Sequence, residues 1–159
     1  VDLVSEDRLC TTIIEMLNVE GVVLEPAGAL TVDALKDLPA HARSGKAILC
    51  IVSGGNFDFE RLAEVKERAL RAEGLKKYFV LRMPQRPGAL KDFLDLLGPE
   101  DDITRFEYLK KSARNFGSVL IGIETRDPAN FAGLMARMTD SGLAWQDITD
   151  NDLMSGILV

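Results

Sequence analysis

The segment 53–56, with the sequence Ser-Gly-Gly-Asn, has the residue types and the position of a ligand-binding turn. It follows a continuously apolar segment, residues 47–52, and precedes a segment of helical periodicity that begins at Asp58. In open α/β sheets, ligands bind where the strands end, and small residues there let a flat or anionic ligand approach the backbone. The glycines also suit a simple sharp reversal of the chain, so the motif by itself leaves both ligand binding and turn formation open.

Few other residues offer catalytic chemistry. A nucleophile triad requires a base, and the only histidine, His41, lies in the polar stretch 40–45, which we expect to be a loop. Cys10 and Cys50 lie within apolar patterns, without CxxC spacing and without a basic neighbour, so we expect both thiols to be buried. The acidic run 100–102 is typical of a solvated turn, and no zinc or di-metal spacing occurs. We therefore expect neither a nucleophilic residue nor a metal site in this chain.

The composition argues against two classes of partner. Of the 159 residues, 47% are hydrophobic and 28% are charged, and 25 acidic against 19 basic side chains leave a formal net charge of -6. Because no basic field is available to hold a phosphate backbone, we expect no nucleic-acid partner. We expect no membrane span either, because the longest apolar run is residues 47–52, whereas a spanning helix requires about twenty residues.

The cysteine usage and the ends of the sequence bear on its cellular setting. Two cysteines without disulfide-like spacing, and no secretory segment at the start, favour a reducing cytoplasm. The chain starts at Val1 without an initiating methionine. We therefore expect it to be the tail of a longer cytoplasmic polypeptide.

The first half of the chain has the pattern of an α/β protein. Three helices are expected, each with apolar residues at helical spacing and a capping or breaking residue near its ends: residues 5–21, 30–39 and 58–73. The continuously apolar segment 47–52 predicts a strand that is covered on both faces, as in a parallel sheet. One strand cannot form a sheet by itself, so residues 1–73 are expected to be a piece of a larger α/β domain.

After Gly74 the pattern changes to alternating short strands and helices. Four strands are expected at residues 78–83, 103–110, 119–123 and 143–148, and two helices at residues 89–97 and 128–141. The order β-α-β-β-α-β is the ferredoxin-like arrangement, in which helices cover one face of a four-stranded antiparallel sheet. The last apolar piece, residues 153–159, has no place in this unit and is expected to be an extra edge strand.

Four segments closely resemble the carboxy-terminal part of the biosynthetic threonine dehydratase (threonine ammonia-lyase) family: residues 23–29, 51–58, 78–90 and 102–108. The first two are shared among fold-type-II pyridoxal-phosphate lyases, which include serine racemase, and so they indicate a cofactor class. The last two mark the ACT-like regulatory domain of the isoleucine-pathway enzyme. The resemblance covers essentially the whole chain. It implies an α/β fragment of a fold-type-II pyridoxal-phosphate catalytic domain over residues 1–73, followed by an α+β ferredoxin-like ACT-like domain (βαββαβ) over residues 74–159.

The resemblance also implies a cofactor-binding group. Ser53 matches the serine whose hydroxyl meets the pyridine nitrogen of pyridoxal 5'-phosphate, and a neutral hydroxyl there favours β-elimination of water from L-threonine, which yields 2-oxobutanoate and ammonia. The supporting residues implied around it are Gly54, Gly55, Asn56 and Glu25. The family's Schiff-base lysine and phosphate loop have no counterpart here, and Lys46 is not in that context. The chain alone is therefore expected to be inactive.

The ACT-like resemblance implies a site for a free amino acid beside the turn that follows the first strand of the second half. The residues expected there are Arg86, Gly88, Leu90, Phe106 and Tyr108. The helix start at Gly88 offers N–H groups to a carboxylate, and a branched side chain needs an apolar wall. The resemblance implies isoleucine as an inhibitor, valine as its antagonist, and a homotetramer. The alternative is that Gly88 only builds the turn, and that Phe106 and Tyr108 pack the sheet against its helices.

Two other functions stay open at this point. One is a stand-alone amino-acid-binding or dimerisation module without catalysis, in which Ser53 would not face a pyridoxal ring. The other is a degradative serine or threonine deaminase, which shares the turn at Ser53. The segments 84–90 and 103–108 argue against that second alternative.

Overall fold

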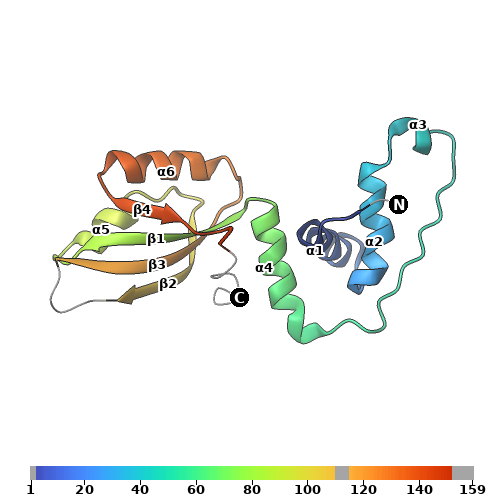
Figure 1. The fold of residues 1–159 in the computed structure, drawn as a ribbon, viewed down its shortest axis with the longest axis horizontal. Helices are drawn as coiled ribbons and strands as arrows, with labels where there is room; N and C mark the ends of the chain where they lie inside the picture. Colours follow the sequence, from blue (N-terminus) through green and yellow to red (C-terminus); the bar gives the residue numbers. More distant parts are fainter. Residues whose placement is uncertain (1–2, 110–114, 152–159) are drawn as a thin grey trace. The chain divides into compact units, whose positions relative to one another are not determined.

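The computed structural model describes residues 3–109 and 115–151. The chain divides into two compact units, Val1–Ala72 and Glu73–Val159. Helices make up the first unit and the sheet belongs to the second (Figure 1), and each unit has its own hydrophobic core. Among the described residues, no helix is long and apolar enough to cross a membrane.

The first unit is built from helices around a small apolar core. In chain order the elements are α1 (Glu6–Glu15) with a π-helical turn (Met16–Glu20), α2 (Pro26–Ala34) with a 3-10 turn (Leu35–Asp37), the short α3 (Ala40–Arg43), and α4 (Leu62–Ala72) after a 3-10 turn (Phe59–Arg61). The core residues come from α1, α2, α4 and the segment before α2: Leu9, Cys10, Ile13, Leu24, Ala29, Val65 and Ala69. The three expected helical regions are therefore helical in the structure.

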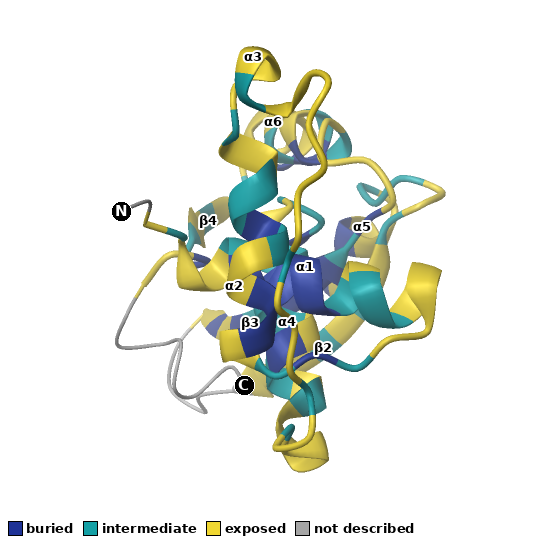
Figure 2. Ribbon diagram, turned by 90° about the vertical axis from the view of Figure 1, so that its right-hand side faces the viewer, coloured by how far each residue is buried: buried dark blue, intermediate teal, exposed yellow. Residues whose placement is uncertain are grey.

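The strand expected over residues 47–52 is absent from the structure. Residues 46–54 run as an extended segment without a strand partner among the described residues, and most of this segment is exposed (yellow in Figure 2), with Leu49 at 91%. The prediction was wrong because an apolar run is buried as a strand only between neighbouring strands and under covering helices. The sheet in the described part of this chain lies wholly in the second unit. The expected loop 40–45 contains α3 instead, on which His41 is exposed.

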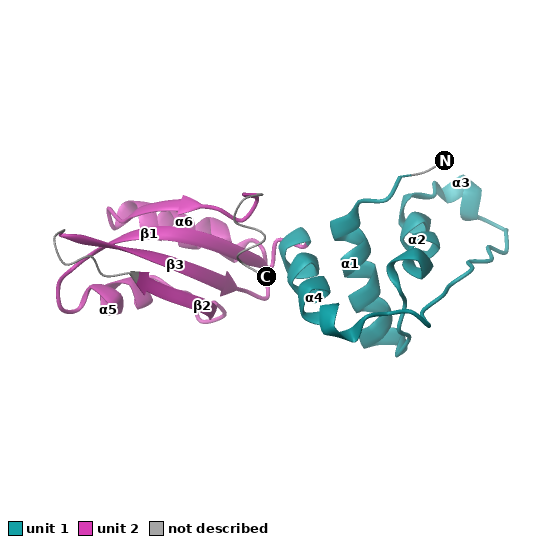
Figure 3. Cartoon of the chain, turned by 60° about the horizontal axis from the view of Figure 1, so that its bottom comes forward, with its two compact units in different colours: residues 1–72 teal, residues 73–159 magenta. Residues whose placement is uncertain are grey.

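The second unit is a four-stranded sheet with two helices on one face (Figure 3). Its elements are β1 (Lys76–Pro84), α5 (Ala89–Leu94), β2 (Asp102–Leu109), β3 (Phe116–Glu124), α6 (Asn130–Asp140) and β4 (Ala144–Asp147). The strands lie in the order β2-β3-β1-β4, and every neighbouring pair is antiparallel. The expected order βαββαβ is confirmed. The extra edge strand expected at 153–159 lies outside the described residues.

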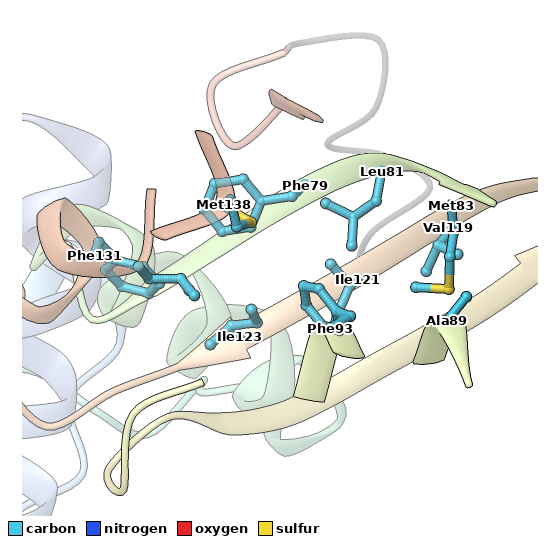
Figure 4. Packing of buried hydrophobic residues seen from close by; sticks show 11 residues of the cluster. Phe79, Leu81, Met83, Ala89, Phe93, Val119, Ile121, Ile123, Phe131 and Met138 are labelled. Carbon is cyan, nitrogen blue, oxygen red and sulfur yellow. The ribbon is translucent and has the colours of Figure 1, made fainter. Parts of the chain in front are cut away.

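Alternation along the strands explains why the helices cover only one face. Phe79, Leu81 and Met83 project from β1 to the same side, because successive strand residues point to opposite faces. Together with residues of β3, α5 and α6 they form the core shown in Figure 4: Phe79, Leu81, Met83, Ala89, Phe93, Val119, Ile121, Ile123, Phe131, Leu134 and Met138. Fully burying a large apolar side chain contributes about 1.5–3 kcal/mol. The second unit thus contains a continuous core within its own sequence.

The opposite face of the sheet carries a smaller cluster around Tyr78 and Ile148. On the helix-covered face, Lys77 Nζ donates to Asp147 Oδ2 at 2.7 Å, and the Thr149 N–H donates to Asp147 Oδ1 at 2.9 Å. Burial raises the pKa of Asp147, but the hydrogen bonds from Lys77 and Thr149 outweigh it, so the net pKa lies below the usual value. Thr149 Oγ1 in turn accepts from the Tyr78 N–H at 3.0 Å. These bonds tie the end of β4 to β1.

Candidate functional site

The turn at Ser53 lies against the start of α2. Ser53 Oγ donates a hydrogen bond to Glu25 Oε1 at 2.6 Å, and the Glu25 N–H donates to the Ser53 carbonyl oxygen at 3.1 Å. Further along α2, Thr31 Oγ1 donates to the Ile51 carbonyl oxygen at 3.0 Å. The structure therefore brings together two segments that are far apart in the sequence and that both resemble cofactor-binding motifs.

Two glycines allow this close approach of backbones. A Cβ on Gly28 would lie 1.9 Å from the Ser53 carbonyl oxygen, and a Cβ on Gly54 would lie 2.1 Å from the Val23 carbonyl oxygen. Neither glycine has a positive φ. Their role is therefore close packing of two chain segments, since any side chain at either position would displace one of them.

Gly55 and Asn56 lie at the outer end of the turn. A Cβ on Gly55 would meet no atom within 4 Å, so no neighbouring group covers the backbone on that side. Asn56 lines a separate cavity of about 150 Å³, together with Cys10 and Val65. Of the residues expected to bind the cofactor, Glu25, Ser53 and Gly54 are gathered at one place, whereas Asn56 faces other residues.

The two cysteines have different surroundings. Cys10 is buried in the core of the first unit, and this burial raises the pKa of its thiol, as expected for an unreactive cysteine. Cys50 is only half-buried, with its Sγ 3.8 Å from the Thr31 carbonyl oxygen. The prediction of a buried thiol is wrong for Cys50, because the segment that carries it is not enclosed in a sheet.

The acidic run 100–102 is solvent-exposed at Glu100 and Asp102, as its composition predicts, but not at Asp101. The Asp101 side chain is buried, and its Oδ2 accepts a hydrogen bond from the Gly98 N–H at 2.6 Å. Arg137 approaches the same oxygen at 3.7 Å. Asp101 therefore stabilises the turn that follows α5. Within residues 3–109 and 115–151, no three His, Cys, Asp or Glu side chains are grouped so that they could hold a metal ion.

A hollow of about 430 Å³ lies between α5 and β2, and we call it the α5–β2 hollow. Its lining residues come from the end of β1, the next turn, α5 and β2: Met83, Pro84, Arg86, Gly88, Ala89, Leu90, Lys91, Leu94, Phe106 and Tyr108. All five residues expected at the effector site are among them. The sequence analysis missed Leu94, although its i+4 spacing from Leu90 places both on one side of a helix. It also missed Lys91, for which no pattern in the sequence gave a signal.

The α5–β2 hollow stays open because the helix on one side is short and the strand on the other side lies at the edge of the sheet. α5 has six residues, which corresponds to about 9 Å of helix, and β2 is an edge strand. Phe106 is paired with Ile121 and Tyr108 with Val119, so both rings lie on the helix-covered face. They nevertheless remain 38% and 41% exposed. The interpretation that these rings only pack the sheet against its helices is therefore incomplete, since they also line the hollow.

Two further glycines shape the hollow. Gly88 has a φ of 83°, a conformation that other residues rarely adopt, and it leads the chain from β1 into α5. A Cβ on Gly117 of β3 would lie 2.5 Å from Tyr108 Cε2. The Tyr108 ring can therefore lie against the backbone of β3 only because Gly117 has no side chain.

The charged side chains that line the α5–β2 hollow differ in whether they already form an ion pair. Arg86 forms an ion pair with Asp92, and both side chains are more than half exposed. The Ala89 N–H donates to the Arg86 carbonyl oxygen at 3.3 Å, so the first amide of α5 is not free for a ligand, contrary to expectation. Lys91 is exposed at the rim and has no ion-pair partner among the described residues. Lys91 and Arg86 are therefore the groups that can hold a carboxylate here.

Comparisons with known proteins connect this unit to a family. The model of the C-terminal regulatory domain of threonine dehydratase matches residues 67–158. The L-threonine dehydratase biosynthetic IlvA of Halalkalibacterium halodurans is 46% identical over 158 residues, which are 99% of this chain and 38% of that protein. Proteins of the same name from Staphylococcus aureus strains bovine RF122 and NCTC 8325 are each 45% identical over 157 residues, or 98% of this chain and 37% of theirs.

The matched relatives are much longer than the chain, which spans less than two-fifths of their length. The match to the regulatory domain nevertheless covers more than half of the chain and includes nearly all of the second unit. The chain therefore belongs to the family of threonine dehydratase C-terminal regulatory domains.

Proposed function

We propose that this chain is the carboxy-terminal part of a pyridoxal-phosphate-dependent threonine ammonia-lyase, and that residues 74–159 sense isoleucine and valine. The complete enzyme converts L-threonine to 2-oxobutanoate and ammonia in isoleucine biosynthesis, as a cytoplasmic homotetramer. The observation that carries the proposal is the α5–β2 hollow, where the five expected effector residues line one space large enough for an amino acid. The names of the matched relatives support the reaction and its substrate.

In this proposal, residues 1–73 are the carboxy-terminal portion of the fold-type-II catalytic domain. The turn at Ser53 fits the pyridine end of the cofactor, because Ser53 is exposed and the bare backbone of Gly55 leaves room for a flat ring. When bound, pyridoxal phosphate supplies a sink for the negative charge that develops at the substrate α-carbon. Ser53 would hold the ring nitrogen, and Glu25 would orient the Ser53 hydroxyl. The Schiff-base lysine and the phosphate-binding loop would come from the rest of the enzyme.

The hydrogen bond between Ser53 and Glu25 limits what the serine can offer. A hydroxyl has a single proton to donate. While Ser53 Oγ donates that proton to Glu25 Oε1, Ser53 can only accept a hydrogen bond from the ring nitrogen. Ser53 donates to an unprotonated nitrogen only after leaving Glu25. The hydrogen bond with Glu25 would thus determine whether the Ser53 hydroxyl or the ring nitrogen is the donor when the two meet.

The α5–β2 hollow can recognise both ends of a branched amino acid. Leu90, Leu94 and Phe106 are partly exposed apolar side chains that gain from covering a branched side chain. The carboxylate would bind the unpaired Lys91 or draw Arg86 away from Asp92. That exchange costs little, because solvent-exposed ion pairs contribute only about 0–1 kcal/mol.

Regulation requires that the effector binds two states of the enzyme with different affinity. Isoleucine would favour a state of low activity and valine would oppose it, with a coupling free energy of about 1–3 kcal/mol. β2 offers a suitable connection, because it is an edge strand whose outer side is unpaired among the described residues and it carries Phe106 and Tyr108. A change at the hollow can therefore reach any neighbouring subunit that pairs with this edge.

Calorimetric titration of the 159-residue chain with isoleucine, valine and threonine tests the proposal. We expect saturable binding of isoleucine and valine and little response to threonine. Leu90→Ala and Phe106→Ala should each weaken isoleucine binding about tenfold, because each removes about 1–2 kcal/mol of apolar contact. Leu49→Ala and Phe59→Ala are matched controls in the first unit, where both side chains are exposed, and they should leave the affinity unchanged.

Two results would contradict the proposal. If a folded chain binds none of the three amino acids, residues 74–159 do not sense them, and a dimerisation module without catalysis becomes the better interpretation. If isoleucine binds but neither Leu90→Ala nor Phe106→Ala weakens it, the effector occupies another site.

A further inference from the structure

The cavity of about 150 Å³ that Asn56 lines lies between α1, α4 and the segment 56–58, and we call it the α1–α4 cavity. The helices α1 and α4 lie side by side in the first unit (Figure 3), and each forms one wall. The segment 56–58 and Pro26, the first residue of α2, line the remaining side. All of the lining residues belong to the first unit. The cavity is therefore separate from the α5–β2 hollow.

The interior of the α1–α4 cavity is apolar. Its buried lining comes from the core of the first unit: Leu9, Cys10 and Ile13 of α1 and Val65 of α4. Phe57, which packs against that core, adds an aromatic ring to the lining. An apolar cavity of about 150 Å³ stays dry and can hold a molecule the size of benzene. Binding such a molecule is favourable in proportion to the apolar area that is removed from water.

The charged side chains that line the α1–α4 cavity are already paired with one another. Arg61 Nε donates to Glu64 Oε2 at 3.1 Å, and Arg68 Nε lies 3.4 Å from Glu64 Oε1. Arg68 also lies 3.4 Å from Glu6. The hydrogen bond from Arg61 holds the pKa of Glu64 below its usual value, so Glu64 stays ionised. A charged ligand would lose its hydration in the apolar interior and find two arginines already balanced by two carboxylates, so the lining favours an uncharged ligand.

Asn56 is the polar side chain of the lining that remains for a hydrogen bond with a ligand. It is exposed, and its side-chain amide forms no hydrogen bond among the residues that the structure describes. An amide side chain can both donate and accept. Asp58, which also lines the cavity, uses Oδ1 to accept from the Glu60 N–H at 3.0 Å, and its negative charge disfavours an anionic ligand further. The lining therefore suits a hydrocarbon body with a single hydroxyl or carbonyl group.

We propose that the α1–α4 cavity is a binding site for a small uncharged alcohol, aromatic or branched aliphatic, with its hydrocarbon body against Cys10 and Val65 and its hydroxyl group on Asn56. Asn56 belongs to the turn that carries Ser53, and α4 is the last element of the first unit. A ligand in the cavity would contact both, so its binding favours the conformation in which the turn lies against α4 as observed. The site does not depend on the proposed function.

Calorimetric titration of the 159-residue chain with phenol tests for binding, and benzene, benzoate and benzylamine test the ligand class. We expect saturable binding of phenol and weaker binding of benzene, which cannot bond to Asn56. Benzoate and protonated benzylamine should bind at least tenfold more weakly than phenol. Asn56→Ala should lower the affinity for phenol to that for benzene, whereas Asn18→Ala, at an exposed asparagine elsewhere in the same unit, is the matched control and should have no effect.

The two cysteines assign the binding to the cavity. Cys10→Leu should abolish phenol binding, because the larger side chain fills the space, whereas Cys50→Leu, outside the cavity, should leave the affinity unchanged. Circular dichroism checks that each variant is folded. In the parent chain, phenol at about ten times its dissociation constant should slow the modification of Cys10 by methyl methanethiolsulfonate about tenfold, since the reagent and phenol compete for the same space. The half-buried Cys50 should react at an unchanged rate.

Three results would overturn the site. They are no saturable binding of phenol by the folded chain, phenol binding that Cys10→Leu leaves intact, and equal protection of Cys10 and Cys50 by phenol. Benzoate binding as tight as that of phenol would overturn the assignment to an uncharged ligand. Phenol binding that Cys10→Leu abolishes, in a chain that binds no isoleucine, supports this site while contradicting the effector site in the α5–β2 hollow. The two proposals therefore fail separately.

Discussion

The two units of this chain differ in how completely their apolar residues are buried by other residues of the same unit. The second unit contains all the strands of the sheet that the structure describes and both helices that cover them, so its apolar residues meet partners within the same stretch of sequence. The first unit has a helical core but leaves the apolar segment 46–54 exposed. An alternating segment is thus a buried strand in β1, whereas the continuously apolar segment before α4 is uncovered. Burial stabilises apolar side chains, but they can be buried only where neighbouring strands or helices are available to cover them.

The largest difference in stability loss between the units is expected when a buried phenylalanine of the second unit and an exposed one of the first unit are each replaced. Phe131 of α6 is 1% exposed and packs on Phe79, with ring centroids 6.3 Å apart, so Phe131→Ala should destabilise the second unit by about 3–5 kcal/mol. Phe59→Ala, at a position 64% exposed in the first unit, removes only an edge-to-face contact with Phe57 at 5.3 Å and should cost at most about 1.5 kcal/mol. Urea unfolding followed by Trp145 emission and by circular dichroism measures both, and similar losses for the two variants would contradict the comparison.

The stability of the first unit should be sensitive to the loss of a buried carboxylate. Asp33 on α2 is fully buried, accepts from Thr12 Oγ1 at 2.6 Å and pairs with Arg8 of α1. Asp33→Ala should destabilise this unit by about 3 kcal/mol, since removing one partner leaves the others uncompensated. Amide hydrogen exchange of α1 is the measurement. Asp37→Ala removes the exposed partner of the same arginine and should have little effect; an equal effect of the two variants would show that burial is not the cause.

Acid should weaken the second unit through Asp147. The pKa of Asp147 is lower in the folded than in the unfolded chain, so its ionised form contributes stability above the unfolded value of about 3.9, and this contribution is lost as the pH falls from there towards the folded value. Asp147→Asn should cost about 1–2 kcal/mol at pH 7. The difference from the parent chain should shrink below about pH 4 in urea titrations. A difference that is independent of pH would mean that ionisation of Asp147 does not matter.

The smallest effect is expected in the exposed apolar segment. Leu49→Asp should change the free energy of unfolding by less than about 0.5 kcal/mol, because Leu49 has few neighbours to lose. The same change should reduce self-association of the chain, measured by sedimentation velocity, since exposed apolar patches favour association. Gln146→Asp, at an exposed polar position in the second unit, is the control for the added charge. A large loss of stability in Leu49→Asp would show that this segment is packed after all.

The elements of the second unit could be predicted from the sequence because their signals are local. Alternation of Phe79, Leu81 and Met83 defines a half-buried strand, and Gly142, with a φ of 73°, ends α6 where a glycine is favoured. The segment 47–52 has an equally clear local signal, yet the structure contradicts the prediction. A strand requires a partner, and no local pattern states whether one is present.

For the sites, the sequence by itself determined which residue types were available and, through resemblance, which segments belong together. Only the tertiary structure decided that Ser53 donates its proton to Glu25, that Gly117 makes room for the Tyr108 ring, and that Arg86 pairs with Asp92 beside the α5–β2 hollow. These contacts join residues distant in sequence, and their geometry depends on how strands and helices pack. Local patterns specify elements, whereas a binding site consists of the spaces left between them.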